Sequence, residues 1–209
     1  LGDVYKRQHV YRTAGVLAGL GLSYGGATTE EDVVGLIFAD QGIDLSKISG
    51  DIKIVSYLQG YGDTTTDEIN AAIQAAPEAF ISVGMATTFF TQQLNAAGIE
   101  FSDIDSFTKS NGEAITNGKL VYLAGKYSSS VGPAFALVMN AINGNVIRDA
   151  QGNAVSLSQN YQVATDSETF DKFYKNDNGD NPIYSRDTLD QIIGDTVTFD
   201  TINEVVASN

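Results

Sequence analysis

Residues 65–98 read TTDEINAAIQAAPEAFISVGMATTFFTQQLNAAG. The hydroxyl of Thr65 lies three residues before the carboxylate of Glu68, and this capping box predicts the start of a helix that the next proline ends. The apolar run Ala79–Val83 then predicts a strand, and Thr87–Ala97 predicts a second helix closed by a glycine. Because the connections are so short, we expect parallel strands covered by helices, an α/β fold.

The rest of the chain continues this alternation. Further strands are expected at Asp51–Gly60, Asp105–Lys109, Leu120–Ala124 and Tyr161–Val163, and further helices at Val10–Leu22, Ser130–Ile142, from a cap at Thr165 onward, and at Arg186–Ile193 after the cap Ser185. Glu30–Asp40 fits either a buried strand or a helix. Continuous apolar runs such as AFISV suit strands buried on both faces, so we expect a parallel sheet flanked by helices in three α/β/α layers.

Ligands of open α/β sheets bind beyond the carboxyl ends of the strands. Applied to the strands expected here, this rule selects four candidate segments, Gln59–Asp63, Gly84–Thr88, Lys109–Asn111 and Lys126–Ser129.

Composition excludes several classes of function. Lys and Arg total 12 against 26 Asp and Glu, a net charge of −14, which argues against binding nucleic acid or an anionic membrane surface. The absence of Cys removes disulfides and thiol chemistry, and a single histidine, His9, leaves no basis for a His metal cage or a serine triad. No apolar run reaches the ~18 residues of a membrane span. We expect no cofactor, no metal and no catalytic residues.

The first eight residues are expected to lie outside the fold. Asp3–Gln8, DVYKRQ, resembles the translated transposase mosaic end used to build sequencing libraries, and a natural basic arm is the alternative. On the first interpretation the natural chain is truncated at its N-terminus, which would hide any signal peptide, lipid anchor or DNA-binding segment.

Two apparent motifs lack the residues or the context that they require. The glycines of Gly19–Gly25 close a helix, whereas a dinucleotide loop follows a strand and opens a helix. If Gly179 took the sixth position of a calcium loop, Tyr174 and Ser185 would stand where carboxylates are required.

Five short sequence motifs follow one another along the chain. They are Ala14-Gly15 with Ala18-Gly19, Ile81–Met85, Ala97-Gly98, Ile115-x-x-Gly118-x-Leu120 and Ile142-x-Gly144. In this order and spacing, the chain from residue 10 to about 175 resembles the type 1 solute-binding proteins of bacterial ABC sugar importers, the ribose and galactose binder group.

The chain departs from that family at ligand positions. Val83-Gly84 replaces an Asn-Asp pair, Lys126 replaces a Gln, and the stretch Lys109–Asn111 replaces the Asp after the central strand. The resemblance therefore implies the fold and leaves the solute open, with pentose, hexose, inositol, autoinducer-like sugar and nucleoside as the options.

The resemblance also implies a division of the chain. Residues 9–125 would form the C-terminal lobe, 126–160 a returning piece of the N-terminal lobe, and 161–209 a hinge crossing and tail. On the order of a hundred residues of the N-terminal lobe would be missing. The returning helix would then lack packing partners at Ala134, Phe135, Leu137 and Val138.

The function implied is that of an extracytoplasmic, non-enzymatic binding component, in the periplasm or lipid-anchored at the outer cell surface. Two lobes would close about hinges on a sugar or similar small polar solute, and the closed form would be presented to the ABC permease subunits.

Sugar recognition needs planar polar groups and aromatic faces. The candidate ligand-binding residues for polar contacts are Arg12, Lys109, Asn111 and Lys126, and those for aromatic faces are Tyr11, Tyr61 and Tyr127. Gly84 and Met85, in the turn after the strand Ala79–Val83, complete the set. Each has a plainer alternative: Lys126 as a solvated hinge lysine, Asn111 as a turn residue, Arg12 as the partner of an acidic neighbour.

Two other functions remain open. The same two-lobed fold serves as the effector domain of sugar-responsive repressors, and reading the gene upstream would separate the two. The other is a small α/β enzyme, which the missing His, Cys and phosphate-loop motifs disfavour.

Overall fold

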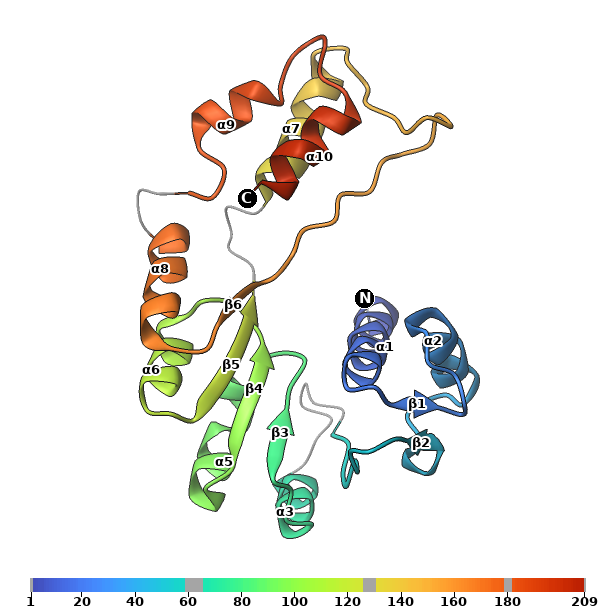
Figure 1. Cartoon of the computed structure of the whole chain (residues 1–209), viewed down its shortest axis with the longest axis vertical. Coiled ribbons are helices and arrows are strands. Elements are labelled where there is room, and N and C mark those ends of the chain that lie inside the picture. Colours follow the sequence, from blue (N-terminus) through green and yellow to red (C-terminus); the bar gives the residue numbers. More distant parts are fainter. Residues whose placement is uncertain (1, 59–65, 126–130, 179–181, 209) are drawn as a thin grey trace. The chain divides into compact units, whose positions relative to one another are not determined.

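The computed structural model describes residues 2–58, 66–125, 131–178 and 182–208, and side chains for all of these except 2–8 and 177–178. The described chain is α/β and divides into two compact units, Leu1–Asp103 and Ile104–Asn209 (Figure 1). The lobe boundaries expected from the resemblance stay a prediction.

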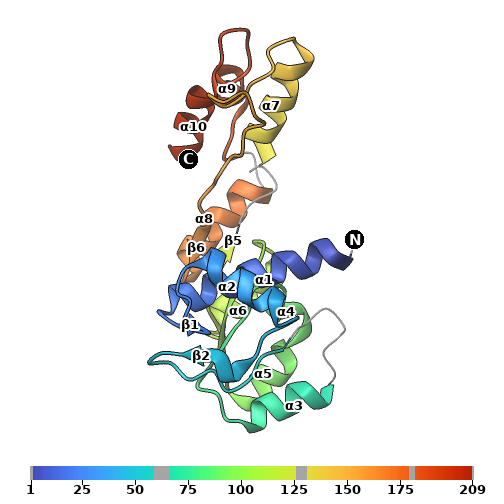
Figure 2. The same ribbon diagram turned by 90° about the vertical axis from the view of Figure 1, so that its right-hand side faces the viewer.

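The first unit begins with a long helix packed on a shorter one. Helix α1 (Gly2–Gly19) is followed by β1 (Ser23–Tyr24), α2 (Glu30–Ala39), a 3₁₀ turn (Leu45–Lys47) and β2 (Ile48–Ser49), which pairs antiparallel with β1 (Figure 2). The ambiguous segment is therefore a helix: Thr29 caps it by accepting from the backbone N–H of Asp32, and acidic residues fill its first turn. The backbone of α1 is helical from Gly2, and the foreign origin expected for residues 1–8 stays a prediction.

A buried cluster joins α1, α2 and the strands between them. Its members are Ala14, Leu17, Leu22, Tyr24, Val33, Val34 and Ile37. The hydroxyl of Tyr24 donates to Asp40 Oδ2 at 2.7 Å and accepts from the backbone N–H of Asp44 at 3.0 Å. Burial raises the pKa of Tyr24, and the hydrogen bond from Lys47 lowers the pKa of Asp40. This cluster therefore satisfies the polar atom that it buries.

The second half of the first unit follows the helix–strand–helix order predicted from residues 65–98. Its elements are α3 (Thr66–Gln74), β3 (Ala79–Ile81), α4 (Ala86–Phe89), α5 (Thr91–Ala97) and β4 (Glu100–Ile104). β3 and β4 are parallel, with Ala79 opposite Glu100, and Gly98 closes α5 at φ 72°. The single helix expected at Thr87–Ala97 is two helices, because Phe90 leaves the helical region at φ −124°.

The second unit adds α6 (Lys109–Thr116), β5 (Leu120–Gly125), α7 (Gly132–Ile142), β6 (Gln162–Ala164), α8 (Ser167–Asn178), α9 (Arg186–Gln191) and α10 (Phe199–Ala207). The strand order of the sheet is β3-β4-β5-β6. β6 pairs antiparallel with β5, so the sheet is mixed and the prediction of an all-parallel sheet is wrong.

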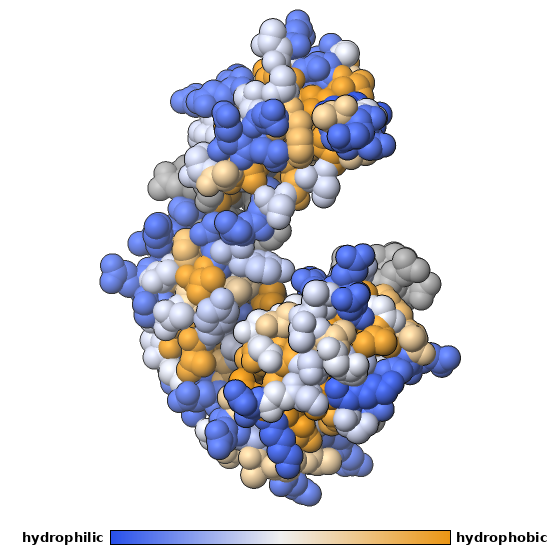
Figure 3. Space-filling model, turned by 45° about the vertical axis from the view of Figure 1, so that its right-hand side comes forward, coloured by the Kyte–Doolittle hydropathy of each residue, from blue (hydrophilic) through white to orange (hydrophobic). Residues whose placement is uncertain are grey.

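A small helical cluster forms the end of the second unit. Ala136 of α7 packs with Ile192, Ile202 and Val206 from α9 and α10. The buried side chain of Asn140 donates to the carbonyl of Ile192 and accepts from the N–H of Gly194, both at 2.8 Å. Figure 3 shows hydrophobic residues reaching the surface over this part of the chain.

Two strand predictions are wrong. The strand expected at Asp51–Gly60 is absent from described residues 51–58, which run extended without a strand partner. The strand expected at Asp105–Lys109 is displaced: β4 ends at Ile104, and Thr108 caps α6 by accepting from the N–H of Asn111. Alternating side chains are not enough for a strand, which also needs a neighbouring strand to pair with.

Two finer predictions also fail. AFISV is not buried on both faces, since Ala79 and Ile81 of β3 are exposed. The cap of α8 is Asp166 rather than Thr165: its Oδ1 accepts from the N–H of Thr169 at 2.7 Å. In contrast, Ser185 caps α9 as predicted.

Candidate functional site

The loop after β3 is held in shape by its own hydrogen bonds. Ser82 Oγ accepts from the N–H of Gly84 and donates to the carbonyl of the same residue, both at 3.1 Å. Met85, the next residue, adopts a left-handed conformation at φ 62°, which is uncommon for a residue with a side chain. The loop therefore holds Gly84 and Met85 in a defined, strained turn at the carboxyl end of a strand.

Arg12 contacts this loop from a distant part of the sequence. Its guanidinium Nη1 donates to the carbonyl of Val83 at 2.9 Å, across 71 residues. Arg12 lies inside α1 rather than at a helix start as expected, and Tyr11 beside it is 51% exposed. The structure thus brings Arg12 to the loop that contains Gly84 and Met85.

Asp103 supports the same loop and was missed by sequence reasoning. The carboxylate is almost fully buried, and its Oδ2 accepts from the backbone N–H of Ala86 at 2.7 Å. This bond fixes the residue that directly follows Met85, so Asp103 is a positioning residue. An acid at an inward position of the alternating run Glu100–Ile104 is the signal that could have found it.

Two further candidates, Lys109 and Asn111, lie in the first turn of α6 in the second unit. Asn111 is fully buried, and its Nδ2 donates to the carbonyl of Ser106 at 2.7 Å and to Asp105 Oδ2 at 3.3 Å. Its Oδ1 has no hydrogen-bond partner among the described residues. Lys109 is exposed at the first residue of α6. Asn111 therefore holds the turn together, which is the plainer of its two expected roles.

Gly125 ends β5 beside this loop. A Cβ built on it would lie 2.1 Å from the backbone carbonyl oxygen of Asp105, so only glycine allows this approach. The remaining candidates, Tyr61, Lys126 and Tyr127, lie outside the described residues.

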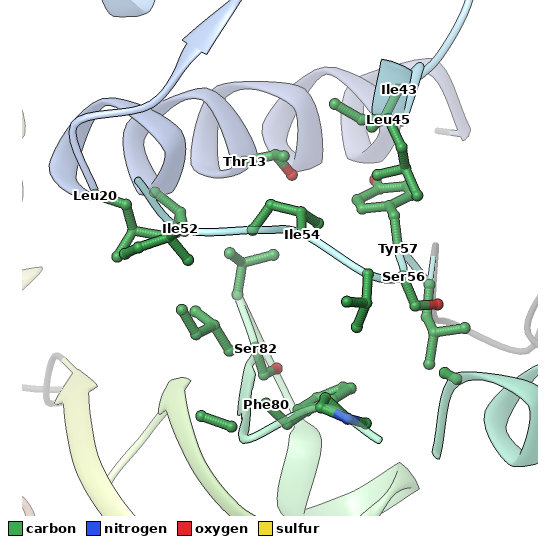
Figure 4. A pocket seen from close by; sticks show the side chains of 18 of the residues that line it. Thr13, Leu20, Ile43, Leu45, Ile52, Ile54, Ser56, Tyr57, Phe80 and Ser82 are labelled. Atoms are coloured by element: carbon green, nitrogen blue, oxygen red, sulfur yellow. The ribbon is translucent and has the colours of Figure 1, made fainter. Parts of the chain in front are cut away.

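A cavity of about 750 Å³ lies within the first unit. Figure 4 shows side chains from α1, from the extended segment 52–58 and from β3 pointing toward one another around it. Aliphatic and aromatic residues make up most of the wall, among them Leu17, Leu20, Ile43, Leu45, Ile52, Ile54, Val55, Phe80, Ile81 and Phe89. Of the predicted site residues that the structure describes, Gly84 is in the wall and Arg12 and Met85 are not.

Sequence reasoning missed the cavity because it assigned part of the wall to a paired strand. Tyr57 is the largest polar side chain in the wall; burial raises its pKa, and a hydrogen bond with Thr13 acts in the opposite direction. The alternation of Ile52 and Ile54 indicated an apolar face, but it did not indicate that the face would line a hole.

Metal sites and membrane helices are absent from the described ranges. No group of three or more His, Cys, Asp or Glu side chains there could hold a metal ion. None of the described helices combines the length and the apolar character needed to cross a bilayer.

Comparison with models of protein families, with curated proteins and with solved structures found no match to this chain.

Proposed function

We propose that this chain belongs to an extracytoplasmic solute-binding protein of a bacterial ABC importer, related to the type 1 sugar binders. It captures a sugar or a similar small polar solute and presents it to the permease subunits. It carries out no catalysis, and its place is the periplasm or the outer face of a single membrane.

One observation carries this proposal: the hydrogen bond from Arg12 to the carbonyl of Val83. It joins the first helix to the loop after β3, and both segments are candidate solute contacts by sequence. Loops beyond the carboxyl ends of strands are where open α/β sheets bind ligands. A guanidinium has five N–H donors in a planar fork, so Arg12 can hold Val83 and still offer donors to the paired hydroxyls of a sugar.

Lys109, exposed at the first residue of α6, is a further candidate solute contact. The buried Asn111 only organises the turn before it, through Ser106 and Asp105. Because the solute gains by contacting groups on both lobes, lobe closure follows from its higher affinity for the closed state. Closure about a hinge is the known mode of this class of receptor.

The test is calorimetric titration of the chain with pentoses, hexoses, inositol and nucleosides, with Arg12→Ala and the exposed Arg148→Ala compared. Loss of a hydrogen bond from a charged donor costs about 1.5–3 kcal/mol, so we expect affinity for the best solute to fall at least about tenfold in Arg12→Ala. Arg148→Ala should bind as the unchanged chain does. Equal affinity in all three proteins would contradict the assignment of Arg12, and no binding by any member of the panel would contradict the function.

A further inference from the structure

The cavity of the first unit has the size of a small-molecule site. Its volume of about 750 Å³ falls in the range of about 300–1,000 Å³ that ligand pockets occupy. All of its wall comes from the first unit, from α1, the 3₁₀ turn, residues 51–58, α3, β3 and the helix after the β3 loop.

The wall offers no buried charge. Asp51, Lys53 and Glu78 are the charged wall residues among those described, and none of the three is buried. His9 also lines the cavity, and burial, together with the nearby charge of Arg12, lowers its pKa, which favours the neutral ring at pH 7. A charged ligand would lose its hydration here without finding a buried counter-charge.

Five of the exposed large apolar side chains described in the first unit line this cavity, while Tyr11, Leu36 and Phe38 are exposed elsewhere. Ile52, Val55, Tyr57, Ile81 and Phe89 are between 37% and 46% exposed, and all five line it. Large apolar side chains left open to water around one hollow mark a surface that gains free energy when an apolar partner covers it.

Two side-chain hydroxyls of the wall, from different segments of the chain, lie next to each other. Thr13 projects from α1, and Tyr57 projects from the extended segment (Figure 4). Tyr57 and Thr13 share a hydrogen bond, and Ser82 Oγ is engaged with Gly84. The Tyr57–Thr13 pair can therefore receive one polar group of a ligand, such as a carbonyl or a hydroxyl.

We propose that this cavity binds an uncharged, largely apolar molecule that carries a single carbonyl or hydroxyl group. Its ligand is of a different class from the polar solute proposed above. The cavity shares Val83 and Gly84 with the loop after β3, but its wall does not include Arg12 or Met85. The apolar body covers the aliphatic wall, and the polar group bonds with the hydroxyl of Tyr57.

The test uses prodan, an uncharged naphthalene ketone whose emission shifts to the blue in apolar surroundings. We expect a saturable blue shift with one dye per chain. Val55→Trp, which fills the cavity, should weaken dye binding at least tenfold. The matched control is Val138→Trp on the exposed face of α7, which should leave dye affinity within twofold. Circular dichroism and urea unfolding of each variant establish that it is folded.

A second variant probes the polar group without adding bulk. Tyr57→Phe should weaken prodan several-fold and leave the binding of naphthalene, which lacks the carbonyl, unchanged. An equal loss for both molecules would overturn the role of Tyr57.

Three results would overturn the site itself. The first is that prodan shows no saturable binding. The second is that Val138→Trp abolishes dye binding while Val55→Trp keeps it. The third is slow amide hydrogen exchange throughout residues 52–58 in the free chain. The last result would mean that this segment pairs with β3 and closes the cavity. The sugars and nucleosides of the first panel should not displace the dye, so failure of this inference and failure of the proposed function are distinguishable.

Discussion

Helices α1 and α7 both carry apolar residues at helical spacing, but they differ in how much of that surface is covered. Ala14 and Leu17 of α1 are buried against α2 in the cluster that contains Tyr24. α7 buries Ala136 on one face, while its opposite face, Val131, Phe135, Val138 and Ile142, is between 50% and 71% exposed. A helix with one apolar face is satisfied by one neighbour, and a helix with two apolar faces needs two.

The outward face of α7 agrees in part with the sequence expectation. Ala134, Phe135 and Val138 are exposed as anticipated, whereas Leu137 packs against the cluster of α9 and α10. The spacing of 131, 135, 138 and 142 is that of a single helical stripe. This pattern suits a helix that packs on a second lobe, which the proposed function calls for.

The largest expected difference between the two helices is in core truncation. Leu17→Ala removes a buried side chain from the α1–α2 cluster and should lower the free energy of unfolding by about 2–5 kcal/mol. Ile142→Ala on the outward face of α7 should change it by less than about 0.5 kcal/mol. Urea unfolding measures both, and similar losses would mean that the α7 face is covered in solution.

The polar anchor of the second cluster should matter next. Asn140→Ala leaves the carbonyl of Ile192 and the N–H of Gly194 without their partner and should cost about 1–3 kcal/mol. Asn143→Ala, at the exposed C-cap of α7, is the matched control and should cost less. If the two variants unfold at the same urea concentration, Asn140 does not hold α7 to α9.

In the α1–α2 cluster the buried hydroxyl of Tyr24 bonds to Asp40, which is ionisable. The stability of this cluster should therefore depend on pH, whereas the contribution of Asn140 should not. The hydrogen bond from Lys47 lowers the pKa of Asp40 in the folded state, so the unfolded state binds a proton more readily. The stabilisation is therefore present above the usual pKa of an Asp and is lost as pH falls through the lower folded value.

The test measures the free energy of unfolding of the unchanged chain and of Asp40→Asn, each at neutral and at strongly acidic pH. We expect a smaller acid-induced loss of stability in the variant. The same dependence on pH in both proteins would show that the Tyr24–Asp40–Lys47 group makes no net contribution.

The smallest effect on stability is expected for Phe135→Ser. Its ring is half exposed, so the free energy of unfolding should stay within about 0.5 kcal/mol, while self-association at high concentration should decrease. Sedimentation velocity would measure the second effect. A large loss of stability would show that Phe135 already has a packing partner.

Local signals predicted much of the fold. The glycine at position 98 and the apolar run of β3 located elements of 66–98, because each signal acts over a few residues. Thr65 of the predicted capping box lies outside the described residues. Pairing was less predictable, since it depends on distant neighbours: DSFTK alternates like a strand, yet Thr108 starts a helix inside it. The antiparallel β6 and the unpaired segment 52–58 were mispredicted for the same reason.

The candidate site shows the same division. Order and spacing select Arg12, Gly84 and Met85, and the structure brings Arg12 to the loop that holds the other two. Asp103 was overlooked because no strand was expected at Glu100–Ile104, and its role appears only through its bond to Ala86. The cavity exists because α1, residues 51–58 and β3 do not pack closely against one another. Packing between such distant segments cannot be predicted from a local sequence pattern.

The central claim is that a small polar solute binds at the loop after β3. A ¹H–¹⁵N NMR titration of the chain with the best solute of the panel tests it most directly. We expect saturable shifts of the backbone amides of Arg12, Gly84 and Met85, with those of Met139–Ile142 in α7 unchanged. Saturable shifts confined to 52–58, or to α7, α9 and α10, would contradict the claim.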